Sequence, residues 1–170
     1  MNKVWMIADT HFGHSKIINF ESRPFHTIEE MDETLIDNWN KVVKNGHDVF
    51  INGDFSFYGK DKTKEIVSKL NGIKHLITGN HDGKSRKFYL ECGIEQVIQF
   101  PILYENFFVL SHQPIYLNEN MPYANIFGHV HSNPMYEDFT SQSFCVSAER
   151  INYTPIDFEQ IKKSMRGYKK

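Results

Sequence analysis

Short apolar runs alternate with amphipathic stretches in the first half of the chain. The runs are rich in Val, Ile and Trp, and each stops at a polar loop, as buried strands do. Apolar residues also recur at intervals of three and four from Ile28 to Val42, behind a capping-box pair of Thr27 and Glu30, which predicts a helix. The pattern therefore predicts strands over 3–8, 48–52 and 73–78, and helices from 28 to about 45 and over 60–70 and 86–92.

The second half of the chain is richer in predicted strands. Apolar runs cover 94–100, 107–110, 124–127 and 144–147, and a short helix is expected over 158–165. Strands that alternate with helices favour a layered α/β architecture. A chain of 170 residues has the size of one domain. We therefore expect residues 1–170 to form a single α/β domain of layered, mixed β-sheets, packed as a sandwich and flanked by helices.

Composition limits the classes of protein to which this domain can belong. Apolar residues make up 40% and charged residues 24%, which is ordinary for a soluble protein, and a net charge of −2 does not demand nucleic acid as a bulk partner. No apolar run approaches the roughly 20 residues of a membrane span, so we expect no membrane partner and a cytoplasmic location. Cys92 and Cys145 lie far apart in the sequence and predict neither a zinc clamp nor a redox pair.

Polar residues of one chemical kind stand where the predicted strands end. Asp9, Asp54 and Asn80 follow three runs of the first half, and His112 and His129 follow two runs of the second. In α/β sheets, ligand sites form in the loops beyond the carboxyl ends of strands. The ordered set is Asp9-Thr10-His11, Gly53-Asp54, Gly79-Asn80-His81-Asp82, Ser111-His112 and Gly128-His129-Val130-His131.

The donor types in this set point to a pair of metal ions. Oxygen and imidazole donors without thiolate suit manganese, iron, zinc or nickel. Two ions need about seven or eight ligand bonds from the protein, one carboxylate being shared, and the set supplies that number. We therefore expect two divalent ions, with manganese as the first choice. Gly53, Gly79 and Gly128 each precede a ligand, where a strand must end sharply and the backbone must approach closely.

These motifs resemble those of the calcineurin-like metallophosphoesterases, whose pattern is D-x-H, GD, GNH(D/E), H and GHxH. All five elements occur here in that order across residues 9–131. The stretches DTHFGHSKIINFESRPF and ERINYTPIDF are similar to a small single-domain branch of the family that is common in bacteria and phages. The resemblance implies the calcineurin-like fold, with one ion held by Asp9, His11, Asp54 and His131, and the other by Asp54, Asn80, His112 and His129.

The resemblance also implies a mechanism of phosphate ester hydrolysis. A hydroxide held between the two ions would attack phosphorus in line, without a covalent intermediate on the protein. His81 would bind no metal and would act as the general acid that protonates the leaving oxygen. Asp82 would orient His81 or a metal-binding residue from behind.

One departure from the family bears on the substrate. Its protein phosphatases carry GDxxDRG, whereas residues 53–59 here read GDFSFYG, with no arginine to grip a monoester dianion. This favours phosphodiesters or small nucleotide-type esters, and the partner would be such an ester, a nucleotide or a nucleic-acid end. A phosphomonoesterase is the alternative within the family. A metal-loaded, non-catalytic interaction module is the alternative outside it.

Three residues beyond the metal motifs are candidates for substrate contact. His14 follows the first metal loop, Arg23 lies in a stretch shared with the family branch, and Phe55 follows the second metal loop. Aromatic residues beside these loops either pack in the core or form a stacking wall for a flat group. The sequence leaves both a monomer and a homodimer open.

Overall fold

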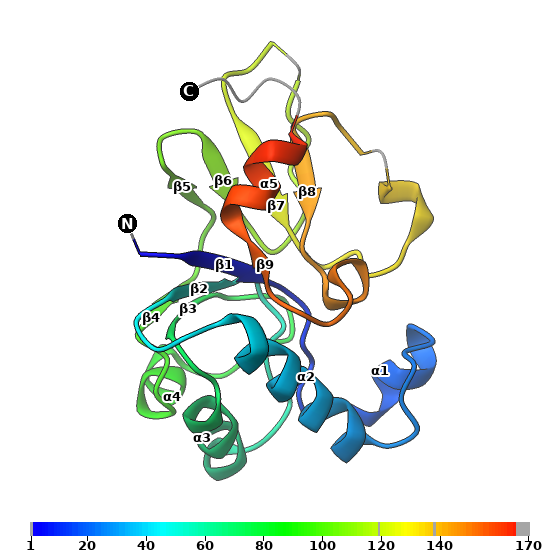
Figure 1. Cartoon of the computed structure of the whole chain (residues 1–170), viewed down its shortest axis with the longest axis vertical. Helices are drawn as coiled ribbons and strands as arrows, with labels where there is room; N and C mark the ends of the chain where they lie inside the picture. The colour runs from blue at the N-terminus through cyan, green and yellow to red at the C-terminus, as the bar shows by residue number, and fades with distance from the viewer. Residues whose placement is uncertain (1, 119, 138, 166–170) are drawn as a thin grey trace.

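The computed structural model describes residues 2–118, 120–137 and 139–165, whose strands form two sheets (Figure 1). One sheet has five strands in the order β4-β3-β2-β1-β9, and the other has four in the order β5-β6-β7-β8. The strands of the first are β1 (Val4–Ile7), β2 (Asp48–Ile51), β3 (Ile73–Ile77), β4 (Gln96–Ile98) and β9 (Ile156–Asp157). Those of the second are β5 (Ile102–Tyr104), β6 (Phe108–Leu110), β7 (Ala124–Phe127) and β8 (Ser143–Cys145).

Both sheets mix parallel and antiparallel pairing, as the sequence predicts. Strands β1 to β4 run parallel, with Ile7 opposite Ile51, and β9 returns antiparallel to β1. In the second sheet β5 is antiparallel to β6, whereas β6, β7 and β8 run parallel. Because neighbouring parallel strands end at the same edge of a sheet, the loops that follow them lie side by side.

Helices lie on the outer face of the five-stranded sheet and at the side of the second sheet. The first group is α2 (Ile28–Val42), α3 (Lys60–Lys69) and α4 (Arg86–Glu91), and α5 (Phe158–Ser164) lies against the second sheet (Figure 1). Helix α2 begins as predicted, because the Thr27 side chain accepts a hydrogen bond from the Glu30 N–H at 3.1 Å. No helix in the described part of the chain is long and apolar enough to cross a membrane.

Each central strand divides its side chains between two hydrophobic cores. In β1, Trp5 and Ile7 pack towards the helices, whereas Met6 faces the second sheet. In β2, Phe50 faces the second sheet in the same way. Burial on both faces explains why these strands read as unbroken apolar runs rather than as alternating patterns. The result is the predicted layered sandwich with flanking helices.

Ala8 joins the two sheets directly. It forms a parallel bridge with Ser147, in which the Ala8 N–H donates to the Val146 carbonyl at 2.8 Å and the Ala148 N–H donates to the Ala8 carbonyl at 3.0 Å. The short 3₁₀ helix η2 (Ala148–Ile151) follows at once. This junction brings the end of β1 against the end of the second sheet, so ligands from both halves of the chain can meet there.

One short α-helix and two short strands are among the elements that were not predicted. Helix α1 (Ser15–Phe20) has only six residues and no side-chain cap, and it buries only Ile17. Strand β5 follows Pro101, and β9 has two residues, too few to show a period. The predicted strand over 94–100 is also too long, since β4 covers only three residues. Strand β9 pairs with β1, about 150 positions away, and local sequence patterns do not reveal such a partner. Strand β5 pairs with its neighbour β6, but its three residues are too few to mark a strand.

Candidate metal centre

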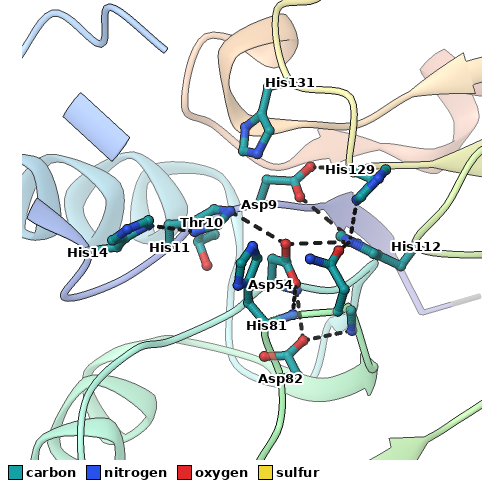
Figure 2. Close-up of polar contacts among 12 residues, drawn as sticks. Asp9, Thr10, His11, His14, Asp54, His81, Asp82, His112, His129 and His131 are labelled. Carbon is teal, nitrogen blue, oxygen red and sulfur yellow. Dashed lines mark hydrogen bonds and ion pairs between the residues drawn. The ribbon is translucent and has the colours of Figure 1, made fainter. Parts of the chain in front are cut away.

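The predicted metal ligands converge at the strand ends near the junction of the two sheets (Figure 2). Asp9, Asp54 and Asn80 follow β1, β2 and β3, while His112 and His129 follow β6 and β7. The two groups therefore come from different sheets. Possible ligand atoms of Asp9, His11 and His131 lie within 4.8 Å of one another, and so do those of Asp54, His112 and His129.

Around Asp54, His112 and His129, with Asn80 beside them, the donor atoms are spaced like neighbours around one ion. His112 Nε2 lies 2.9 Å from Asn80 Oδ1, 3.2 Å from His129 Nδ1 and 3.4 Å from Asp54 Oδ2. Donors bound at about 2.0–2.2 Å to one ion lie roughly 2.8–3.6 Å from their neighbours. The four residues therefore have the separations of a coordination sphere.

One oxygen of Asp54 lies between the two groups of donors. Asp54 Oδ2 is 3.4 Å from His112 Nε2 and 3.6 Å from His11 Nε2. The other oxygen, Oδ1, accepts a hydrogen bond from the His81 backbone N–H at 2.9 Å. The carboxylate is thus fixed through one oxygen and presents the other to both groups at once.

Two buried ligand atoms of the first group lack hydrogen-bond partners among the described residues. These are Asp9 Oδ1 and His11 Nε2. The second Asp9 oxygen accepts from the Ser147 hydroxyl at 2.6 Å and from the His129 N–H at 2.8 Å. A buried polar atom left without a partner costs about 1–3 kcal/mol, and a bound cation would satisfy both orphaned atoms. The arrangement therefore fits a metal ion.

Hydrogen bonds behind the histidines leave their other ring nitrogens free to bind metal. His112 Nδ1 lies 2.9 Å from the Asn52 carbonyl, and His131 Nδ1 lies 3.0 Å from Glu149 Oε1. A ring N–H that donates to such an oxygen leaves the opposite nitrogen as a lone-pair donor. Asn52, Ser147 and Glu149 were not predicted. The sequence did hold a signal for Glu149, because this residue lies in the ERINYTPIDF stretch that is similar to the family branch.

The expectation that Arg23 contacts substrate is wrong, because its side chain is buried behind the metal loop. Its guanidinium donates to the carbonyl of Asp9 at 2.6 Å and to that of Thr10 at 3.0 Å. It also forms an ion pair with Glu149 at 2.7 Å. All three contacts face the interior, so Arg23 supports the ligand loop instead.

The same expectation is wrong for Phe55. Its side chain is 0% exposed and packs edge-on against Phe12, with ring centroids 5.5 Å apart. Phe57 is the ring of this loop that reaches the surface, at 40% exposed, and it stacks on His14 with centroids 4.0 Å apart. His14 also places its Nδ1 3.2 Å from His11 Nδ1, at the rim of the centre (Figure 2).

Asp82 lies beneath the Asp54 loop. Its carboxylate accepts hydrogen bonds from the N–H groups of Asp54, Phe55 and Gly79 at 2.7, 3.0 and 2.9 Å. It therefore holds the backbone of the predicted ligand Asp54 in place, which is the geometry that the second of its two expected roles requires. His81 is exposed and its ring lies beside those of His11, His14 and Phe57.

The ligand loops have unusual backbone geometry. Five of the predicted ligands adopt left-handed conformations, with φ between 48° and 71°, a region that costs energy for residues other than glycine and is common at functional sites. Close approach by glycine is confirmed at Gly79, where a Cβ would lie 2.2 Å from Asp54 Oδ1, and at Gly128, where it would lie 2.7 Å from Asp9 Oδ2. The left-handed ligands are Asp9, His11, Asp54, His129 and His131.

Burial and charge set the protonation of the ligands. Burial raises the pKa of Asp9 to about 6 and lowers that of His11 to about 2, which keeps the His11 imidazole neutral and able to bind metal. For Asp54, burial alone would raise the pKa, but the hydrogen bond and charge of His112 outweigh it and the pKa falls to about 2. The Asp54 carboxylate is therefore held in its anionic form, which is the form that a metal ion would need.

Comparison with known proteins places this chain in a family. The model of the calcineurin-like phosphoesterase family matches residues 2–167. An uncharacterized protein of Methanocaldococcus jannaschii is 38% identical over 172 residues, covering 96% of this chain and 91% of that protein. The gene 66 protein of Mycobacterium phage L5 is 35% identical over 86 residues, covering 49% of this chain and 41% of that protein.

One solved structure is similar over almost the whole chain, and a second shares the fold over part of it. A protein of unknown function from Aquifex aeolicus superposes with a TM-score of 0.76 at 26% identity, covering 96% of this chain and 99% of that one. The nuclease MPE of Pseudomonas putida shares the fold, with a TM-score of 0.51 at 21% identity, covering 75% of this chain and 61% of that one. The family generally consists of metal-dependent hydrolases of phosphate esters. Because the family model matches almost the whole length of this chain, the chain belongs to the calcineurin-like phosphoesterases.

Proposed function

We propose that this protein hydrolyses phosphodiesters or small nucleotide-type phosphate esters with two divalent metal ions, of which manganese suits the donors best. The position of Asp54 Oδ2 carries this proposal, because it lies 3.4 Å from His112 Nε2 and 3.6 Å from His11 Nε2. A single carboxylate oxygen placed between two groups of donors is the arrangement expected of a bridging ligand.

The donors divide into two sets around this oxygen. When bound, two divalent ions would neutralise the phosphoryl oxygens and make water nucleophilic near neutral pH. The protein's part is to hold the donors in place through hydrogen bonds from behind. One set is Asp9, His11, Asp54 and His131, and the other is Asp54, Asn80, His112 and His129.

His81 is assigned the proton donation to the leaving group. Its backbone is fixed by the hydrogen bond to Asp54 Oδ1, and its exposed ring projects beside the centre rather than into either donor group. A protonated imidazole at this place can give a proton to a departing alkoxide. His14 and Phe57 line the same side, where they can contact the leaving group.

Metal content gives the first test of the proposed pair of metal ions. We expect two divalent ions per chain, because seven residues supply donors in two groups that share Asp54. Elemental analysis after removal of metal by a chelator and reloading with manganese measures the number directly. His112→Ala should lose metal, whereas His26→Ala, at an exposed position, should not. Saturation at one ion under excess metal would contradict the paired centre.

Substrate preference gives the second test. Because no arginine follows Asp54 in the manner of GDxxDRG, we expect kcat/KM to be higher for bis(p-nitrophenyl) phosphate than for p-nitrophenyl phosphate. Both esters are assayed with manganese, zinc and nickel, and chelated protein is the control. The opposite ranking with all three metals would make the protein a phosphomonoesterase. No turnover of either ester by metal-loaded protein would favour a non-catalytic module.

A further inference from the structure

A cavity of about 370 Å³ adjoins the metal centre on the side of His112. It lies beyond the ends of β3, β4 and β6, and its wall includes Asn80 and His112 as well as Gln99, Phe100 and Gln113. Since two proposed metal ligands form part of the wall, a phosphate ester held at the metals would have this cavity within reach of one of its substituents.

Among the described residues that line the cavity, His112 is the one whose side chain can carry a charge. No described residue that lines it carries a carboxylate, an ammonium or a guanidinium group. Gln99 and Gln113 offer amide donors and acceptors, and Phe100, which is 75% exposed, offers a free ring face. Such a wall favours an uncharged, flat group with hydrogen-bonding edges over a second phosphate or an acidic peptide.

The size of the cavity also limits the occupant. Small-molecule pockets range from about 300 to 1,000 Å³, and this cavity lies near the lower end of that range. A base with its sugar is of the size that such a pocket accommodates. A nucleoside therefore matches the cavity in volume, in charge and in the character of its wall.

The cavity and the proposed proton donor lie on different sides of the centre. Figure 2 shows His14 and His81 on one side of Asp54, and His112 and His129 on the other. A phosphodiester has one ester oxygen that leaves and one that stays. If the leaving oxygen takes its proton on the His81 side, the retained arm extends towards His112 and the cavity.

We propose that this cavity is the binding site for a nucleoside on the retained arm of a phosphodiester substrate. The proposal rests on the proposed function and deepens it, because it names the substrate class as nucleoside diesters. Phe100 would stack on the base, and Gln99 and Gln113 would contact its polar edge.

Two esters with the same leaving group test the proposal. They are the p-nitrophenyl ester of thymidine monophosphate and p-nitrophenyl methyl phosphate, so only the retained arm differs. Wild-type protein loaded with manganese should have a kcat/KM for the thymidine ester about 10-fold or more above that for the methyl ester, as expected from one base–aromatic stack. Phe100→Ala should remove most of this preference, and Phe100→Trp, which keeps an aromatic ring at this position, should retain it.

Leu103→Ala is the matched control, since Leu103 is a nearby exposed apolar residue, at 50%, outside the wall of the cavity. It should leave the preference unchanged. A wild-type protein that cleaves both esters equally well, or a Phe100→Ala variant that keeps the preference, would overturn the cavity assignment while leaving the phosphoesterase intact.

Equilibrium binding provides a readout that does not depend on turnover. Metal-loaded protein should bind thymidine monophosphate more tightly than methyl phosphate in calorimetric titrations, and Phe100→Ala should lose that difference. If neither ester is cleaved but this selectivity is found, the cavity assignment stands and the proposed hydrolysis fails. Equal affinity for the two phosphates would overturn the cavity assignment.

Discussion

Asp54→Asn is expected to lower kcat/KM for bis(p-nitrophenyl) phosphate by at least about 1,000-fold, well beyond the 10–100-fold typical of a residue that only supports a ligand. The reason is that one Asp54 oxygen faces His11 and His112 together, at 3.6 and 3.4 Å. An amide in its place removes the negative charge from both donor groups. Steady-state kinetics, with metal content measured on the same samples, gives the result.

Asp48→Asn serves as the control for Asp54→Asn. Asp48 begins the same strand, β2, and lies at the end opposite to the centre, where its carboxylate contacts His75. Its replacement should leave kcat/KM within a few-fold of wild type. The bridging role would be wrong if Asp54→Asn retained near-normal turnover while His131→Ala abolished it.

His81→Ala should have an effect that depends on the leaving group. An alkoxide such as a ribose oxygen leaves poorly without a proton, whereas nitrophenolate leaves readily as an anion. General acids typically contribute about 10²–10⁴-fold, so the variant should lose that much on dithymidine phosphate and far less on the p-nitrophenyl ester of thymidine monophosphate. Metal content should not change, because His81 belongs to neither donor group.

His26→Ala is the matched variant for His81→Ala, as an exposed histidine in the loop before α2. It should leave kcat/KM for both esters unchanged. An equal loss on both esters with metal intact would reassign His81 to binding the phosphate group. An equal loss accompanied by loss of metal would make His81 a ligand.

The layered fold was predictable because its central strands are buried on both faces. That burial gives β1, β2 and β3 their continuous apolar runs, and it gives α2 a clear apolar stripe that includes Met31, Leu35 and Trp39. The pairing of β9 with β1 was not predictable, since two residues carry no period and the partner lies about 150 positions away. The same holds for the bridge between Ala8 and Ser147.

The convergence of the predicted metal ligands could be foreseen because their chemistry is specific and five of them directly follow recognisable strands. The residues behind them could not be foreseen, since Ser147 and Asn52 are ordinary polar residues until the fold places them against Asp9 and His112. For Arg23 and Phe55, by contrast, the sequence suggested a substrate contact that the fold does not allow. Position in the sequence beside a metal loop says nothing of which way a side chain turns, and both turn inward.

The junction at Ala8 also fixes when this centre can come into existence during protein synthesis. Asp9 leaves the ribosome early, but the hydroxyl that holds its carboxylate belongs to Ser147, 138 residues later. The first half of the chain can collapse around its own helices before His129 and His131 have been made. The complete set of candidate ligands can therefore assemble only late in synthesis, and a half-made chain carries carboxylates and imidazoles that the second half has not yet enclosed.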